Sequence, residues 1–118
     1  MEKSLREIIN EYRNKIKDST NLTPELAANY LVEITSYMGN VNERLLDAQM
    51  AYNDKLSDTL DEIKSVAKAQ IKAQCSQEYR NLQEVKGYQS LMTEIIRGLK
   101  YYLRALGDEY GFSKSNNN

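Results

Sequence analysis

The fold is decided by residues 41–86, VNERLLDAQMAYNDKLSDTLDEIKSVAKAQIKAQCSQEYRNLQEVK, a stretch that contains no proline. Its apolar residues recur at spacings of three and four, the period of one face of an α-helix. The series comprises Leu45, Ala48, Tyr52, Leu56, Leu60, Ile63, Ala67, Ile71, Cys75, Tyr79 and Leu82. One helix of this length would extend about 69 Å, too long for a compact chain of 118 residues. The stretch therefore predicts a long helix that is broken or packed against a partner.

Several positions in and around this stretch favour a break, because their residues disfavour helix interiors or favour helix ends. They are Gly39-Asn40, Asn53-Asp54, Ser57-Asp58, the pair Thr59 and Glu62 with capping-box spacing, and Gly87.

Helical patterns also flank the central stretch. Leu5, Ile8, Ile9, Tyr12 and Ile16 predict an amphipathic helix over about residues 2–17. Thr23-Pro24-Glu25 predicts the start of the next helix, with Thr23 as N-cap. A last helix is expected from Ser76 or Tyr88 to Leu106, with Gly107 and Gly111 as stops.

Together these segments predict an all-α fold. We expect a long antiparallel helical hairpin, or coiled-coil-like bundle, with a short N-terminal helix. The scarcity of proline (1) and glycine (5) agrees with this fold class. The chain length favours one helical domain, over residues 1–112, followed by a flexible polar tail at 113–118.

The composition argues against an enzyme. The chain has no histidine and one cysteine, which removes the commonest acid–base, metal and disulfide chemistry. Cys75 lies on the apolar series, so we expect a buried, inert thiol. The acidic pattern closest to a magnesium site, Asp58-x-x-Asp61 with Glu62, lacks the Glu-x-x-Glu and Glu-x-x-Asp pairs of helical nucleotide pyrophosphohydrolases. We expect no catalytic residue, metal or cofactor.

No apolar run approaches the roughly 18 residues of a membrane span. The N-terminal residues include acidic side chains, unlike a signal peptide. We therefore expect no membrane association and a cytoplasmic protein, located in the host cytoplasm if it is viral.

The near-neutral net charge of -1 conceals opposed segments. Residues 1–17 carry +2, residues 18–63 carry -7, residues 64–104 carry +5 and residues 105–118 carry -1. The favoured interpretation is that acidic and basic helices lie side by side, within a hairpin or between copies of the chain. The alternative is a nucleic-acid face formed by Lys64, Lys68 and Lys72, spaced four residues apart. No aromatic residue is interleaved with these lysines for base stacking.

The chain contains nine tyrosines, an unusual preference among its large apolar residues. A tyrosine combines a large apolar ring with a polar tip, which suits the rim of a core or an interface. Tyr52, Tyr79, Tyr101 and Tyr102 are candidate interface anchors. Because adjacent helical residues point about 100° apart, Tyr101 and Tyr102 cannot both face one core.

Three segments carry a resemblance to a known group of proteins. Leu22-Thr23-Pro24-Glu25-Leu26, Ala48-Gln49-Met50-Ala51-Tyr52-Asn53 and Ile95-Ile96-Arg97-Gly98-Leu99-Lys100 resemble small helical proteins of unknown function encoded by tailed phages. The resemblance covers about residues 20–106. It implies a viral accessory protein, in some cases encoded near replication and recombination genes, and it implies no catalytic residue.

The sequence therefore predicts a non-enzymatic protein–protein interaction module. Because the apolar series over residues 45–82 is too continuous for one chain to cover, we expect a homo-oligomer, most simply a dimer, that acts on a host or viral protein. The alternative function is a nucleic-acid-binding accessory protein of replication or recombination that uses the lysine face.

Overall fold

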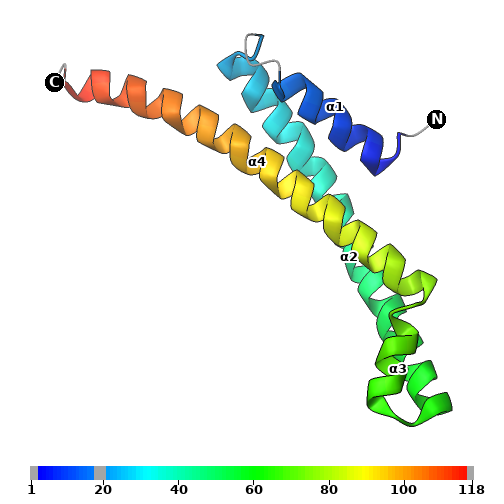
Figure 1. The fold of residues 1–118 in the computed structure, drawn as a ribbon. Coiled ribbons are helices and arrows are strands. Elements are labelled where there is room, and N and C mark those ends of the chain that lie inside the picture. The colour runs from blue at the N-terminus through cyan, green and yellow to red at the C-terminus, as the bar shows by residue number, and fades with distance from the viewer. Residues whose placement is uncertain (1–2, 18–20, 117–118) are drawn as a thin grey trace. The chain divides into compact units, whose positions relative to one another are not determined.

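The computed structural model describes residues 3–17 and 21–116, with side chains described as far as residue 107. The described residues form four α-helices and no strand: α1 (Leu5–Lys17), α2 (Pro24–Ile63), α3 (Val66–Ala73) and α4 (Gln77–Asn116) (Figure 1). The predicted all-α class is confirmed. The helices are grouped into two compact units, unit 1 from Met1–Met38 and Ser90–Asn118, and unit 2 from Gly39–Gln89.

Unit 1 has a core formed by one side of α1, the beginning of α2 and the middle of α4. The N-terminal helix and its apolar face are confirmed, since four of its five predicted apolar residues are buried and Ile16 is half-buried. Its buried residues are Leu5, Ile8, Ile9, Tyr12, Ala27, Ile34, Met92, Ile95 and Leu99. The Tyr12 hydroxyl donates to Glu33 Oε2 at 2.5 Å, which links α1 to α2.

Unit 2 contains the hairpin that the sequence predicts. The Gln89 side-chain amide donates to Asn42 at 2.9 Å, and the rings of Tyr52 and Tyr79 lie 5.3 Å apart. Advancing from Asn42 to Tyr52 in α2 therefore corresponds to moving back from Gln89 to Tyr79 in α4, so these helix segments are antiparallel. Its buried residues are Val41, Ala48, Thr59, Ala69, Ala73, Leu82 and Val85.

Helix α2 begins where the sequence predicts. The hydroxyl oxygen of Thr23 accepts a hydrogen bond from the backbone N–H of Leu26 at 3.1 Å, which confirms it as N-cap. Helix α4 begins after Ser76, whose hydroxyl accepts from the Tyr79 N–H at 3.2 Å and donates to the Ala73 carbonyl. Of the two predicted starts for the last helix, Ser76 is correct.

The predicted breaks were wrong. Gly39-Asn40, Asn53-Asp54 and Ser57-Asp58 lie inside α2, and Gly87 lies inside α4. Thr59 is a buried helical residue whose hydroxyl donates to the Lys55 carbonyl at 2.7 Å, so it is not an N-cap. A glycine inside a helix costs about 1 kcal/mol relative to alanine, which the packing of a long helix can offset.

The chain instead breaks at two other places. Lys64 adopts a left-handed conformation, with φ 63°, and its N–H donates to the Leu60 carbonyl at 2.7 Å. This is the αL arrangement that ends helices, normally with glycine at this position. The second break, between α3 and α4, contains Cys75, which is exposed. The expectation of a buried thiol was wrong because the helical series stops before this residue.

The prediction that Gly107 and Gly111 end the last helix was also wrong. Helix α4 passes Gly107 and Gly111 and continues to Asn116, into the segment expected as a polar tail. Residues 117–118 lie outside the described part of the chain. The single domain over residues 1–112 stays a prediction, because α2 and α4 each contribute to both units.

Candidate interaction surfaces

The three lysines of the predicted nucleic-acid face do not share a helix. Lys68 and Lys72 are exposed on α3, whereas Lys64 precedes that helix in the connection with φ 63°. The Lys72 ammonium lies 3.4 Å from a Glu62 carboxylate oxygen. The expectation of one helical face with three lysines was therefore wrong, because the break after Ile63 removes Lys64 from it and a carboxylate faces Lys72.

Three of the four candidate tyrosines contact their own chain. Tyr52 and Tyr79 are half-buried and pack ring against ring within unit 2. The half-buried Tyr102 donates from its hydroxyl to the Leu22 carbonyl at 3.0 Å, within unit 1. Tyr101 is 74% exposed. The predicted divergence of the two neighbours is confirmed, and Tyr101 is the one that presents its ring to solvent.

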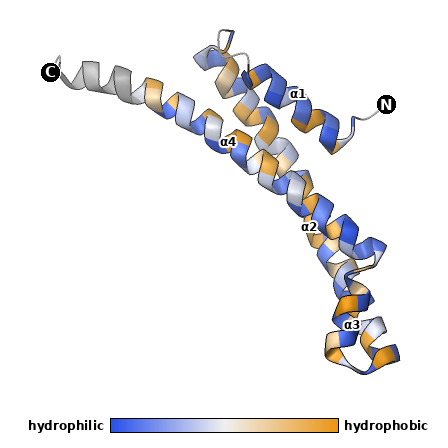
Figure 2. Cartoon of the chain, in the orientation of Figure 1, coloured by the Kyte–Doolittle hydropathy of each residue, from blue (hydrophilic) through white to orange (hydrophobic). Residues whose placement is uncertain are grey.

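Helix α3 is inverted relative to an ordinary amphipathic helix. It buries the small residues Ala69 and Ala73 completely, whereas Val66 and Ile71 are 61% and 66% exposed. The predicted apolar stripe of Ala67, Ile71 and Cys75 thus faces solvent. Hydrophobic residues on α3 and on the adjoining end of α2 can be followed in Figure 2.

Unit 2 also exposes large apolar side chains on α2. Leu46 and Met50 are 61% and 57% exposed and lie one turn apart, so their side chains are neighbours on the helix. Leu60, three turns further on, lies on the same side of the helix by its spacing. We refer to these three residues together with Val66 and Ile71 as the exposed apolar set of unit 2.

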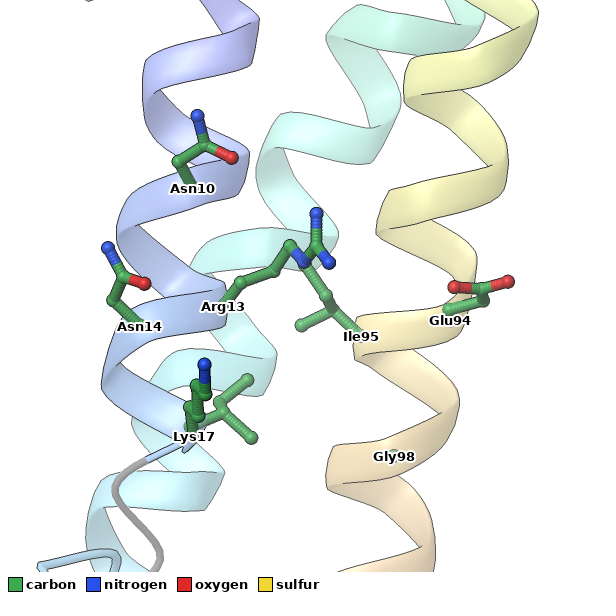
Figure 3. Close-up of a pocket in the computed structure, with 8 residues that line it drawn as sticks. Asn10, Arg13, Asn14, Lys17, Glu94, Ile95 and Gly98 are labelled. Atoms are coloured by element: carbon green, nitrogen blue, oxygen red, sulfur yellow. The ribbon is translucent and has the colours of Figure 1, made fainter.

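Unit 1 contains an open groove of about 640 Å³ between α1 and α4 (Figure 3). Helix α1 contributes Asn10, Arg13, Asn14, Ile16 and Lys17, and α4 contributes Glu94, Ile95 and Gly98. Arg13 extends from α1 into the space between the helices (Figure 3). Gly98 widens the groove, because no heavy atom lies within 4 Å of the place where a Cβ would stand. The lining residues include amides, cations and one carboxylate, together with the apolar Ile16 and Ile95. This mixture suits the binding of a polar surface.

A second hollow, of about 300 Å³, lies on another side of α4. It is lined by Thr93, Ile96, Arg97, Lys100, Tyr101 and Arg104. We call Arg97, Lys100, Tyr101 and Arg104 the basic–aromatic face. This face is not among the sites predicted from the sequence, although Arg97, Lys100 and Arg104 follow one another at spacings of three and four.

The perturbed titratable groups belong to unit 1 and line neither hollow. Burial raises the pKa of Tyr12, and the hydrogen bond to Glu33 raises it further. The Lys3–Glu11 pair, 2.9 Å apart, is exposed; its hydrogen bond raises the pKa of Lys3 and lowers that of Glu11. Across the described ranges, no group of three or more His, Cys, Asp or Glu side chains is placed to hold a metal ion.

Comparisons with known proteins gave no match, neither to a family model nor to a curated protein nor to a solved structure. None of the helices, as far as the structure describes them, contains a stretch hydrophobic enough over sufficient length to serve as a transmembrane span.

Proposed function

We propose that the protein is a non-enzymatic helical interaction module that associates with a second copy of itself through the exposed apolar set of unit 2. The observation that supports this most strongly is the orientation of α3, which buries Ala69 and Ala73 and turns Ile71 to the opposite side of the helix; Val66, at its first residue, is also exposed. A short helix stabilised only by its own unit would bury its largest side chains, because burial contributes about 1.5–3 kcal/mol for each.

The number of exposed side chains supports association. Five large apolar residues of unit 2 are at least 37% exposed. Burying several of them against a partner offsets the cost of association, which is about 4–15 kcal/mol. Leu46 and Met50 are neighbours on α2, and neighbouring exposed apolar residues are typical of an interaction site, whereas scattered single residues are ordinary.

Charge supports a defined orientation for that partner. One side of α2 carries exposed acidic residues at helical spacing: Glu43, Asp47, Asp54, Asp58 and Asp61. Exposed cations lie on the other helices of unit 2, among them Lys68 on α3 and Arg80 on α4. Opposite charges of this kind add little stability individually but set the pairing of helices.

Sedimentation velocity on the full chain tests the proposal. We expect the wild type at micromolar concentration to have a mass above that of one 13.6 kDa chain. Ile71→Glu should return the mass to one chain, because it places a charge in the apolar contact. Gln83→Glu adds the same charge at an exposed position of α4, outside the exposed apolar set, and should keep the wild-type mass.

A wild-type mass of one chain would contradict the proposal, as would an Ile71→Glu variant that sediments like the wild type. Far-ultraviolet circular dichroism verifies that both variants retain their helices.

The resemblance to tailed-phage accessory proteins supports a host or viral protein as the target of the assembled module.

A further inference from the structure

Three cations on one side of α4 lack carboxylate partners among the described side chains. Arg97, Lys100 and Arg104 are exposed, and no ion pair joins them to another described residue. The ion pairs of the described side chains join Lys3 and Lys15 to Glu11, and Lys72 to Glu62.

The spacing gathers these charges. Residues three, four and seven positions apart lie on the same side of a helix, so the three cations span about 10 Å along it. All three line the same hollow, and the lining residues include no carboxylate. The hollow therefore presents a concentrated positive charge to solvent.

An aromatic ring lies among these cations. Tyr101 lines the hollow together with them and is 74% exposed. Every other tyrosine whose side chain the structure describes is buried or half-buried. An exposed ring between cations is the combination that binds unpaired bases by stacking and phosphates by charge.

We propose that the basic–aromatic face binds single-stranded nucleic acid. Arg97, Lys100 and Arg104 neutralise backbone phosphates, and a base stacks on the ring of Tyr101 beside the hollow. An acidic protein segment would use the cations but would leave the ring without a stacking partner. A duplex would offer phosphates but no unpaired base. This inference concerns unit 1 and does not depend on association through unit 2.

Fluorescence anisotropy with a labelled oligothymidylate and the full-length protein tests the proposal over about 50–200 mM salt. If all three cations contact phosphates, log Kd should rise with log salt concentration with a slope of about 2. Arg97→Gln combined with Arg104→Gln should reduce that slope by about two thirds. These variants should keep the sedimentation behaviour of the wild type.

Tyrosine variants test the stacking. Tyr101→Ala should weaken binding about five-fold or more without changing the salt slope, whereas Tyr101→Phe should bind like the wild type. The matched control is Lys68→Gln with Lys72→Gln, which removes two exposed cations from α3 and should leave binding unchanged. Neither duplex DNA nor polyglutamate should compete effectively with the labelled strand.

Four results would overturn the inference. The first is no binding at low salt. The second is wild-type affinity in Tyr101→Ala, which would indicate a purely ionic contact. The third is equal competition by the duplex, or by polyglutamate, which would identify an acidic protein as the fitting partner. The fourth is loss of binding in the Lys68 and Lys72 control, which would assign binding to the α3 lysines.

Discussion

Tyr101 and Tyr102 are neighbours in the chain, yet their side chains have different surroundings. The hydroxyl of Tyr102 donates to the Leu22 carbonyl, whereas the ring of Tyr101 is 74% exposed among cations. Tyr12 differs from both, because its side chain is buried and its hydroxyl donates a hydrogen bond to Glu33 of α2. The same residue type thus serves as a core residue, a link between helices and a solvent-facing ring.

The Tyr12–Glu33 hydrogen bond yields a prediction about stability. Tyr12→Phe removes this hydrogen bond and should lower the free energy of unfolding by about 1 kcal/mol near neutral pH. Tyr30→Phe removes a hydroxyl from a ring 5.9 Å from that of Tyr12 and serves as the control. Urea unfolding of the three proteins measures the difference.

The same substitution predicts a pH dependence. The pKa of Tyr12 is raised in the folded protein above its ordinary value of 10.0. The stabilisation that Tyr12 gives to the folded protein is therefore fully present below that ordinary pKa. It is lost as the pH rises further, because the tyrosine hydroxyl loses its proton first in the unfolded chain. The difference in unfolding free energy between wild type and Tyr12→Phe should be constant up to about pH 9 and should narrow between about pH 10 and about pH 11. Parallel stability profiles for the two proteins would contradict this.

At the scale of the helices, the connection between α2 and α3 contains a backbone conformation that suits glycine. Lys64 has φ 63°, and a side chain in the left-handed region costs about 1–2 kcal/mol. Its N–H nevertheless closes the end of α2 on the Leu60 carbonyl. The helix ends there because the hydrogen bond and the packing of unit 2 outweigh the preference of lysine.

Lys64→Gly should therefore stabilise the protein by about 0.5–1 kcal/mol, since it relieves the left-handed conformation and keeps the N–H. Lys68→Gly, inside α3, should destabilise it by about 1 kcal/mol, because glycine weakens a helix interior. Thermal unfolding of both variants at one protein concentration compares them. A lower melting temperature for Lys64→Gly would show that the side chain itself stabilises the connection.

These helices show which features the sequence could predict. The starts of α2 and α4 were predictable, because Thr23 and Ser76 are side chains that cap a helix. The end of α2 was not, because Lys64 carries no local signal for a left-handed conformation. The glycines misled the prediction because Gly39 and Gly87 lie inside long helices, two residues from the buried Val41 and Val85. The candidate sites show the same difference between local and non-local features. The different directions of the Tyr101 and Tyr102 side chains were predictable, because the two residues are adjacent on a helix. The exclusion of Lys64 from the helix that contains Lys68 was not, because it depends on the break after Ile63.

For the whole molecule, the two units differ in the kind of surface that they present. Unit 1 contains most of the large buried side chains, exposes Leu26, Val32 and Tyr101, and carries the groove and the basic–aromatic face. Unit 2 includes two fully buried alanines in its core and exposes five large apolar residues. The proposed self-association and the proposed nucleic-acid binding thus concern different units of one chain, so variants can test them separately.

Self-association predicts that thermal stability depends on protein concentration. A partner that binds only the folded chain raises the melting temperature as its concentration increases. Wild type and Gln83→Glu should show this rise in differential scanning fluorimetry, and Ile71→Glu should not. A concentration-independent melting temperature in all three proteins would argue against association of the folded chains.

The alanine-lined inner side of α3 has a consequence for how the protein can diverge. Ala69 and Ala73 are fully buried, whereas Val66 and Ile71 are mostly exposed. The outer residues are therefore free to change during evolution without loss of the fold. A lineage can acquire a new binding specificity on this helix through single substitutions, while the two methyl groups beneath preserve the architecture.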